Sequence, residues 1–535
     1  MILHQKLNPK QITYFRIFII LLFSSLPLLI NLPYRVNIFL TWEGAYRMYM
    51  GQIPFKDFGM PLGFGFWLIP AIFFKIFGPY MHTLIIAQAF LNVLSLLAIS
   101  AIFKMLKMSE AKVFLSILVM CLTFVLINFW PWYNHTVFIF EIFAIYFVIR
   151  YTTTKDSFWQ LIVAAFFTCL SIFTKQDGGG LALIIVSVII LYFSIINKRI
   201  DTPLIFFGSF IVWLLLFIVP FLQYDFSYWF NYGQSPHYSR INIFILLGDI
   251  FGESIWEKFF LFASLAVIFF RFNSVKEFIN NQTEVIFALL TVGLLFQALI
   301  IQTTSFSPVT VNYYFTTFGI AYLLHSLPER YNFSQVGLFL FFCLFIFIWR
   351  SENYWKYGSG AVKKILPKSW SELPEDAVAK GNWMSESEDT VKVEPTIWQL
   401  SKYKSLKHIK LPKKTIEGLE EVEKMSSFKK EGMKVLNMSN LTFLAYEWNY
   451  ELESGPNYPL WYHKDVALFD REIDMLCKKV ANREYDLIIF EDMPTVDSFF
   501  PYAVRDCLEE NYEMELKFPA PTGYGTDHVE IYTLK

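Results

Sequence analysis

The sequence has few charged residues. Asp, Glu, Lys and Arg make up 17% of its 535 residues, whereas hydrophobic residues make up 55% and aromatic residues 19%. This composition lies outside the range of ordinary soluble domains. The formal net charge is −1, so the basic surplus typical of a nucleic-acid partner is missing. The composition therefore indicates a polytopic membrane protein that does not bind nucleic acid.

Cofactor motifs are scarce as well. The five cysteines form no CxxC pair and no zinc spacing, and Cys477 and Cys507 are either a disulfide or two free thiols. His135 and Glu141 are too far apart for an i,i+4 ligand pair, so no metal site is predicted. No Gly-rich nucleotide loop follows any expected strand. No cofactor is therefore predicted with certainty, and only a divalent cation remains open.

Long hydrophobic runs occupy the chain up to about Arg350. A helix that crosses roughly 30 Å of hydrocarbon needs about 20 apolar residues. By this criterion we expect about eleven transmembrane helices, at 12–31, 83–103, 111–128, 135–150, 158–174, 180–197, 203–222, 255–271, 284–302, 309–327 and 334–350.

The positive residues predict how these spans are oriented. Lysines and arginines such as Lys6, Lys104, Arg150, Lys198 and Arg271 fall in alternate loops, which are expected to be cytoplasmic. The first span is expected to be a retained helix rather than a cleaved signal peptide. The N-terminus is then cytoplasmic, and the opposite loops and the tail after Arg350 are extracytoplasmic.

A structured first outer loop is expected within residues 32–82. Glu43 stands in a short polar segment, Thr41-Trp42-Glu43-Gly44, which we interpret as a loop before a helix from Glu43 to Gly51. The apolar segment 61–77 is interrupted by glycines, a proline and a lysine, and is predicted to be an interfacial helix. Such a loop can frame a cavity at the membrane surface.

Several short sequence motifs in this loop resemble those of a known protein family. They are Trp42-Glu43-Gly44 with Tyr46, Gly51-Gln52-Ile53-Pro54-Phe55-Lys56-Asp57, Pro61-Leu62-Gly63 and Phe74-Lys75-Ile76-Phe77-Gly78. In this order they resemble the first outer loop of the GT-C class of membrane glycosyltransferases, in the group of protein O-mannosyltransferases and lipid A aminoarabinose transferase. Phe173-Thr174-Lys175-Gln176 and Asn312-Tyr313-Tyr314 fit the same layout. The family more often has Asp, or Asp-Glu, where this chain has Glu43 alone.

The resemblance implies that a sugar is transferred from a polyprenyl-phosphate donor to a lipid, glycan or protein acceptor on the outer face of the membrane. An inverting transfer needs a general base, a role typically worth about 10²–10⁴ in rate. Glu43 is the first candidate for the base, and its alternative role is to cap the following helix. Asp57 is a second candidate catalytic residue, which could bind the acceptor or a metal ion, or it is equally a turn residue before Gly59.

Basic and aromatic residues are expected around the donor. Lys175 suits the leaving phosphate, although it could also be a lysine that extends to the interface. His237 and Arg240 form a second phosphate or acceptor group. Candidate sugar or acceptor contacts are Tyr46, Trp132 and Tyr313, and the alternative for such aromatics is an interfacial belt.

The tail is expected to contain two parts. Residues 351–413 read as an extended connection, and 414–535 as a small extracytoplasmic α/β domain with a mainly parallel sheet. Its helices are expected near 415–426, 468–481 and 501–511, and its strands at 435–438, 487–490, 513–518 and 528–533. Gly523 and Gly525 are expected in a hairpin turn. In the family such tails are usually supposed to recognise the acceptor.

Two other functions compete with glycosyl transfer. A transporter or flippase of a lipid-linked saccharide would also be helical and aromatic, but such proteins often contain inverted repeats, and we find none here. A non-catalytic scaffold that presents the tail is a third possibility. The expected location is the inner membrane of a bacterium, where the chain would also contact membrane lipids.

Overall fold

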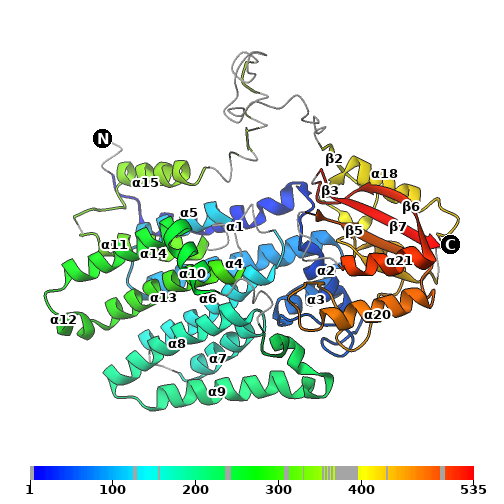
Figure 1. The fold of residues 1–535 in the computed structure, drawn as a ribbon. Helices are drawn as coiled ribbons and strands as arrows, with labels where there is room; N and C mark the ends of the chain where they lie inside the picture. Colours follow the sequence, from blue (N-terminus) through cyan, green and yellow to red (C-terminus); the bar gives the residue numbers. More distant parts are fainter. Residues whose placement is uncertain are drawn as a thin grey trace.

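The structure, a computed structural model, describes residues 5–124, 129–154, 157–234, 242–305, 313–328, 330–351, 355, 358–359, 362, 365–367, 396–428, 432–494, 501–523 and 525–535. A helical region forms one side of the molecule, and a β-sheet from the tail lies at its other side (Figure 1). The short helices α2 and α3 lie between them.

The helical region contains α1 (Pro9–Leu29), α4 (Met81–Met105), α5 (Glu110–Phe124), α6 (Tyr133–Thr154), α7 (Trp159–Ile172), α8 (Gln176–Asn197), α9 (Asp201–Ile218), α10 (Ile243–Gly248), α11 (Ile255–Arg271), α12 (Val275–Asn280), α13 (Gln282–Ser305), α14 (Tyr313–Ser326) and α15 (Val336–Trp349). Each of the eleven expected runs falls on one of these helices. Within the described residues, six helices are long and apolar enough to cross a membrane: α1, α4, α6, α8, α9 with its 3₁₀ extension, and α13. The fold is therefore that expected of a helical membrane protein.

The core of this region forms around α6, which packs against α4, α7 and α8. Its buried face includes Val137, Ile145 and Val148. By contrast, α9 leaves apolar side chains such as Leu204 and Leu215 more than half exposed. A helix that is apolar on its exposed face is typical of contact with lipid rather than with water.

The first loop differs from the prediction in one respect. The helix α2 (Ile38–Tyr49) begins five residues before Glu43, so Glu43 lies mid-helix and neither stands in a loop nor caps a helix start. The reason is packing: an alanine Cβ at Gly44 would lie 2.1 Å from the Trp67 ring, so α2 fits closely against α3 (Gly65–Phe77). The short polar segment is thus a buried helical turn.

The tail contains a four-stranded sheet in the order β4-β5-β7-β6. Its strands are β4 (Val435–Met438), β5 (Leu487–Asp492), β6 (Tyr512–Pro519) and β7 (His528–Leu534), and its helices are α18 (Lys413–Val422), α19 (Leu444–Glu447), α20 (Phe469–Ala481) and α21 (Arg505–Asn511). The four strands and the helices α18, α20 and α21 lie near the expected positions, whereas the short helix α19 was not expected. The prediction of a mainly parallel sheet is wrong, however, since only β4 and β5 pair in parallel. The connection 520–527, which contains Gly523, joins β6 to β7, and a hairpin of this kind connects antiparallel strands.

A second small sheet ties the first loop to the tail. Its order is β1-β3-β2, where β1 (Leu32–Pro33) follows α1 and β2 (Trp398–Leu400) and β3 (Ile409–Pro412) precede α18. The last part of the expected extended connection, from 396 onward, therefore belongs to the folded tail. Residues 368–395 of that connection lie outside the described part of the chain.

The expected loops gather in two sets at opposite ends of the helices. At the tail end, Thr41 Oγ1 donates to Pro131 O (3.0 Å) and Gln176 Nε2 to Pro61 O (3.3 Å), which joins three of the loops predicted to be outside. At the opposite end, Asn197 Nδ2 donates to Gln282 Oε1 (3.2 Å) and Leu7 N to Ser334 O (2.8 Å). We call these the tail end and the opposite end.

Candidate functional site at the tail end

The helix α2 places Glu43 and Arg47 one turn apart on the same face. Arg47 donates twice to Glu43 Oε1, from Nη2 (2.7 Å) and from Nε (2.9 Å). Both side chains are buried, and Arg47 is only 1% exposed. A buried pair of this kind holds two charges away from water and depends on additional hydrogen bonds for its stability.

Arg47 obtains those hydrogen bonds from two other parts of the chain. Its Nη1 donates to Gln52 Oε1 (2.9 Å) and to the Glu453 carbonyl (2.7 Å), and its guanidinium lies about 5.5 Å from the rings of Phe58 and Tyr458. Arg47 therefore connects α2 to the following turn and to the tail. Its role is structural, and it fixes the orientation of the Glu43 carboxylate.

The Glu43 carboxylate keeps one oxygen uncommitted. Both bonds from Arg47 go to Oε1, and Oε2 accepts no hydrogen bond from the described residues. Burial raises the pKa of Glu43, and the Arg47 guanidinium lowers it only in part. A carboxylate with a raised pKa and a free oxygen is suited to accept a proton near neutral pH.

Tyrosines from the tail surround this carboxylate. Burial raises the pKa of Tyr450 and Tyr458, and the negative charge of Glu43 raises both further. Asn437 Nδ2 donates to Tyr450 Oη (2.9 Å), and Tyr34 donates to Asn440 O across the same junction. Phenol hydroxyls and rings are side chains that can hydrogen-bond and stack on a sugar.

A cavity of about 970 Å³ lies beside this cluster, between the end of α2 and the start of β4. Tyr46, Gln52, Lys434 and Tyr450 are among the residues that line it. Tyr46 also stacks on Trp42, with ring centroids 4.6 Å apart. The predicted contact residue Tyr46 thus lines a cavity, whereas Glu43, one turn earlier on α2, is not among its lining residues.

Trp132 lies in the connection that packs against α2. The neighbouring carbonyl of Pro131 accepts the Thr41 hydroxyl, and the Trp132 ring contacts His135 with centroids 5.1 Å apart. The indole Nε1 of Trp132 is buried and has no hydrogen-bond partner among the described residues. Trp132 therefore offers a donor on the same side of the helical region as Glu43.

Lys175 directly precedes α8, and its ammonium forms an ion pair with Asp177 (3.0 Å). The first loop packs closely on this segment, because Gly65 N donates to Phe173 O (2.8 Å). Trp67 Nε1 also donates to Leu40 O (2.8 Å), so α3 contacts both α2 and the α7–α8 connection. Glu43 and Lys175 accordingly belong to separate ion pairs, each on a segment that contacts α3 or its first residue.

Asp57 lies in a turn. Its Oδ2 accepts a hydrogen bond from Ile53 N (2.8 Å), and its carbonyl accepts one from Gly455 N (2.9 Å). The turn alternative thus accounts for its position, and a role in catalysis remains a prediction. His237 and Arg240 lie outside the described residues, as does the side chain of Tyr313, the first residue of α14.

Glu141 in α6 is a buried carboxylate that was not among the predicted site residues. Gln297 Nε2 of α13 donates to Glu141 Oε2 (2.8 Å) and lies 3.4 Å from the Gly178 carbonyl in the first turn of α8. Glu141 Oε1 has no hydrogen-bond partner among the described residues. The available signal was the lone acidic residue in an apolar run, since carboxylates inside membrane spans are usually functional.

One group in the described residues could hold a metal ion: Asp492, His528 and Glu530 offer ligand atoms within 4.8 Å of one another. Arg505 Nη2 already bonds Glu530 (2.6 Å) and Asp492 (3.3 Å), and Lys517 lies 3.5 Å from Glu530. Two cations therefore offset the carboxylates. The arrangement is that of an ion-pair network on the sheet.

The comparisons with known proteins give no relatives. No protein-family model, no curated protein and no solved structure matches this chain. The assignment of a function therefore depends on the chemistry of the site.

Proposed function

We propose that this chain is a membrane glycosyltransferase. It transfers a hexosyl or pentosyl group from a polyprenyl-phosphate donor, with inversion, to a lipid, glycan or protein acceptor on the extracytoplasmic face. The observation that carries the proposal is Glu43, a buried carboxylate with a raised pKa and one free oxygen, held by Arg47 among tyrosines of the tail.

In this proposal Glu43 Oε2 removes the proton from the acceptor hydroxyl as that oxygen attacks the anomeric carbon. The bond from the anomeric carbon to the donor phosphate breaks, and the lipid phosphate leaves with the electron pair. Arg47 keeps the carboxylate oriented, so the base needs no rearrangement when the acceptor arrives. Tyr46 and Trp132 provide ring and N–H contacts for the sugar or the acceptor.

Lys175 offsets the charge that develops on the leaving phosphate. The backbone N–H groups of the first turn of α8 lie beside it, and the N-terminus of a helix favours an anion. Asp177 holds the lysine ammonium at 3.0 Å, so the phosphate would compete with or share that contact. In this proposal His237 and Arg240 form a further group that binds the phosphate or the acceptor.

The proposed topology has eleven transmembrane helices, a cytoplasmic N-terminus and a tail outside the inner membrane of a bacterium. The gathering of the first loop, the 129–132 segment and the tail at one end supports it, because those segments were all expected on the outer side. The disulfide between Cys477 and Cys507 also supports it, since such bonds persist in oxidising compartments. A divalent cation remains open as a cofactor.

The test is sugar transfer in membranes that contain a radiolabelled polyprenyl-phosphate sugar pool, with the products separated as lipid, glycan and protein. Glu43→Gln keeps an oxygen for Arg47 but removes the base, and we expect transfer to fall by about 10²–10⁴. Glu451→Gln changes an exposed carboxylate at the nearby cavity and serves as the matched control. Full transfer by Glu43→Gln at normal expression would refute the assignment of the base.

Translocation of a lipid-linked saccharide is the second candidate. The contact of Glu141 with Gln297 favours it, because it places a polar link inside the helical region between α6, α8 and α13. If the wild type transfers no sugar from any pool, a vesicle assay for lipid-linked saccharide transport, with Glu141→Gln as the variant, decides between the two functions.

A further inference from the structure

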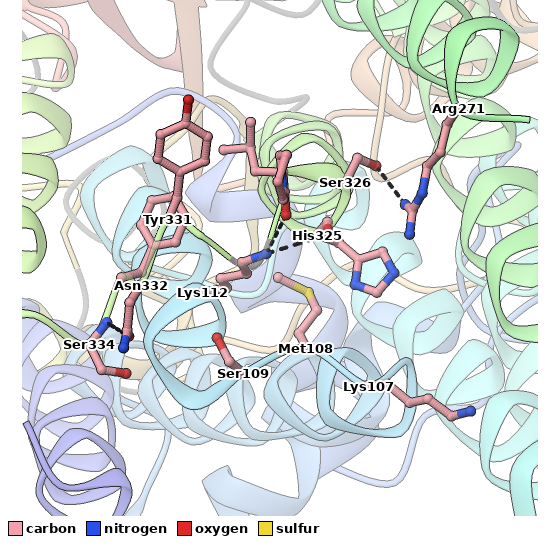
Figure 2. A pocket seen from close by; sticks show the side chains of 13 residues that line it. Lys107, Met108, Ser109, Lys112, Arg271, His325, Ser326, Tyr331, Asn332 and Ser334 are labelled. Atoms are coloured by element: carbon pink, nitrogen blue, oxygen red, sulfur yellow. Dashed lines mark hydrogen bonds between the residues drawn. The ribbon is translucent and has the colours of Figure 1, made fainter. Parts of the chain in front are cut away.

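A second cavity lies at the opposite end of the helical region, far from the candidate site. It has a volume of about 580 Å³ and lies between the α4–α5 connection, the end of α11 and the connection from α14 to α15 (Figure 2). Its described lining includes Lys107, Lys112, Arg271 and His325, and no carboxylate. Glu284, which does not line the cavity, pairs with Arg271 (2.9 Å) and lies 3.2 Å from His325, so the net positive charge of the lining comes from Lys107 and Lys112. A lining of net positive charge favours an anionic ligand.

Contacts hold these cationic side chains in place. Lys112 Nζ lies within hydrogen-bond distance of the His325 and Leu327 carbonyls (3.4 and 3.3 Å) and lies over the Phe333 ring. Arg271 Nη1 donates to Glu284 Oε1 (2.9 Å) and lies 3.4 Å from Ser326 Oγ. Figure 2 shows Lys112, His325 and Arg271 across the pocket, with Lys107 below them.

The start of the helix α5 lies beside the cavity, and the carboxylate of its first residue, Glu110, is paired with Arg16 and Lys104. The helix begins immediately after the cavity residues Met108 and Ser109. The N-terminal end of a helix carries a partial positive charge and presents N–H groups that helical bonds do not use. Ser109 and Ser334 also bring hydroxyl groups to the cavity lining.

An apolar groove adjoins this basic cavity. The groove has a volume of about 260 Å³ and is lined by Val267 of α11, Ile320, Leu323, Leu324 and Ser326 of α14, and Leu327. It shares Ser326 and Leu327 with the basic cavity. A basic pocket that continues into an apolar groove between helices has the chemistry of a lipid headgroup site with room for a chain.

We infer that this composite site binds an anionic membrane phospholipid. Its phosphate lies in the basic cavity among Lys107, Lys112 and Arg271, and part of one acyl chain follows the groove between α11 and α14. The site lies at the end that the lysine pattern predicts to be cytoplasmic, where anionic headgroups attract basic residues. It is separate from the proposed sugar transfer and does not depend on it.

The experiment measures lipid binding by the purified full-length chain. The protein in nonionic detergent is titrated with phosphatidylglycerol or with phosphatidylcholine, and bound lipid is counted by native mass spectrometry. We expect phosphatidylglycerol to bind at least about tenfold more tightly. Equal binding of the two lipids would overturn the inference.

The variants locate the site. Lys107→Gln with Lys112→Gln should weaken phosphatidylglycerol binding roughly 30-fold, or about fivefold for each cation removed. Lys198→Gln with Lys276→Gln removes the same charge from two exposed positions at the same end that do not line the cavity, and should change binding less than about twofold. An equal loss in both double variants would show a diffuse surface effect and refute the site.

Two further measurements identify the ligand. Leu323→Trp fills the groove and should weaken phosphatidylglycerol binding several-fold while the protein remains folded by circular dichroism. Free glycerol phosphate should bind at least about tenfold more weakly than the whole lipid, since it lacks the chain that the groove receives. If glycerol phosphate binds as tightly as phosphatidylglycerol, the ligand is a soluble phosphate. If polyprenyl phosphate displaces phosphatidylglycerol at a lower concentration, the site binds that lipid instead. Either result overturns the assignment.

Discussion

The two ends of the helical region are built in opposite ways. At the tail end, the connections pack on one another and on the tail, and acidic residues such as Glu43, Glu472 and Glu491 are buried. At the opposite end, cations such as Lys107, Lys198 and Arg271 are at least one-third exposed or line a cavity, and the buried carboxylate Glu284 is paired with Arg271. Proton transfer and sugar chemistry need a site that excludes water, whereas binding to charged lipid headgroups needs exposed cations.

The same contrast appears in the electrostatics of the tail end. Burial raises the pKa of Glu472 to about 8 and that of Glu491 to about 7. Glu472 lies where the tail docks on the helical region, because it accepts the hydroxyl of Tyr228 from the 3₁₀ segment Phe226–Gly233, a bond that lowers its pKa in part. Tyr34 of the first loop likewise contacts the tail, where it donates to Asn440 O. Substitutions that weaken this docking should therefore change the stability of the tail end and leave the opposite end unaffected.

The largest effect is expected from Gly63→Ala. A Cβ at Gly63 would lie 1.7 Å from the Phe173 carbonyl oxygen, so the first loop or the α7–α8 connection must move. We expect the free energy of unfolding to fall by about 4 kcal/mol or more, together with loss of the bond from Gly65 N to Phe173 O. Denaturant titration in detergent, with hydrogen exchange at both ends, measures the change and its location.

Gly180→Ala is the matched control for this substitution. A Cβ at Gly180 in α8 meets no atom within 4 Å, so the exchange should be neutral or slightly stabilising. If Gly63→Ala were as stable as Gly180→Ala, the close packing of the first loop on the α7–α8 connection would be wrong.

Loss of the disulfide should have the next largest effect. Cys477 of α20 and Cys507 of α21 are 30 residues apart, and breaking a loop of this length typically costs about 2–4 kcal/mol. Replacement of both by Ser should lower the stability of the tail by this amount and make it more sensitive to protease. Cys343→Ser changes a free cysteine of α15 and should cost less than about 1 kcal/mol. Equal sensitivity in the two variants would contradict a structural disulfide.

Much of the fold was predictable because its signals are local. Apolar runs mark helices such as α8, which covers the expected run at 180–197, and β4 has the expected bounds. Strand pairing was not predictable in the same way, since it depends on contacts between distant segments. The hairpin with Gly523 was the one local signal for an antiparallel pair.

The candidate site shows the same limit. Glu43 and Arg47 are four residues apart, a spacing at which opposite charges pair on a helix, so this ion pair could have been inferred. The Glu453 carbonyl that completes the contacts of Arg47 lies 406 residues away, and Gln297 lies 156 residues from Glu141. The prediction of a loop at Glu43 failed for this reason, because Trp67 and the tail bury what the sequence presents as a polar segment.

The smallest effect is a pH dependence at the docking surface of the tail. Glu472 of α20 accepts the Tyr228 hydroxyl (3.1 Å), and burial raises its pKa from 4.5 to about 8. Between these values the folded state binds more protons than the unfolded state, so stability from this group is full below pH 4.5 and is lost as the pH rises toward 8.

Glu472→Gln removes this dependence. The variant should match the wild type near pH 5, where the buried carboxyl is protonated, and exceed it by about 1–2 kcal/mol at pH 9, where the wild type buries a charge. Thermal unfolding at the two pH values measures the difference, and Asp474→Asn, at an exposed position on the same helix, is the control. If Glu472→Gln stabilises the protein equally at pH 5 and pH 9, the effect comes from packing. Protonation of the Glu472 carboxyl would then make no contribution to the docking of the tail.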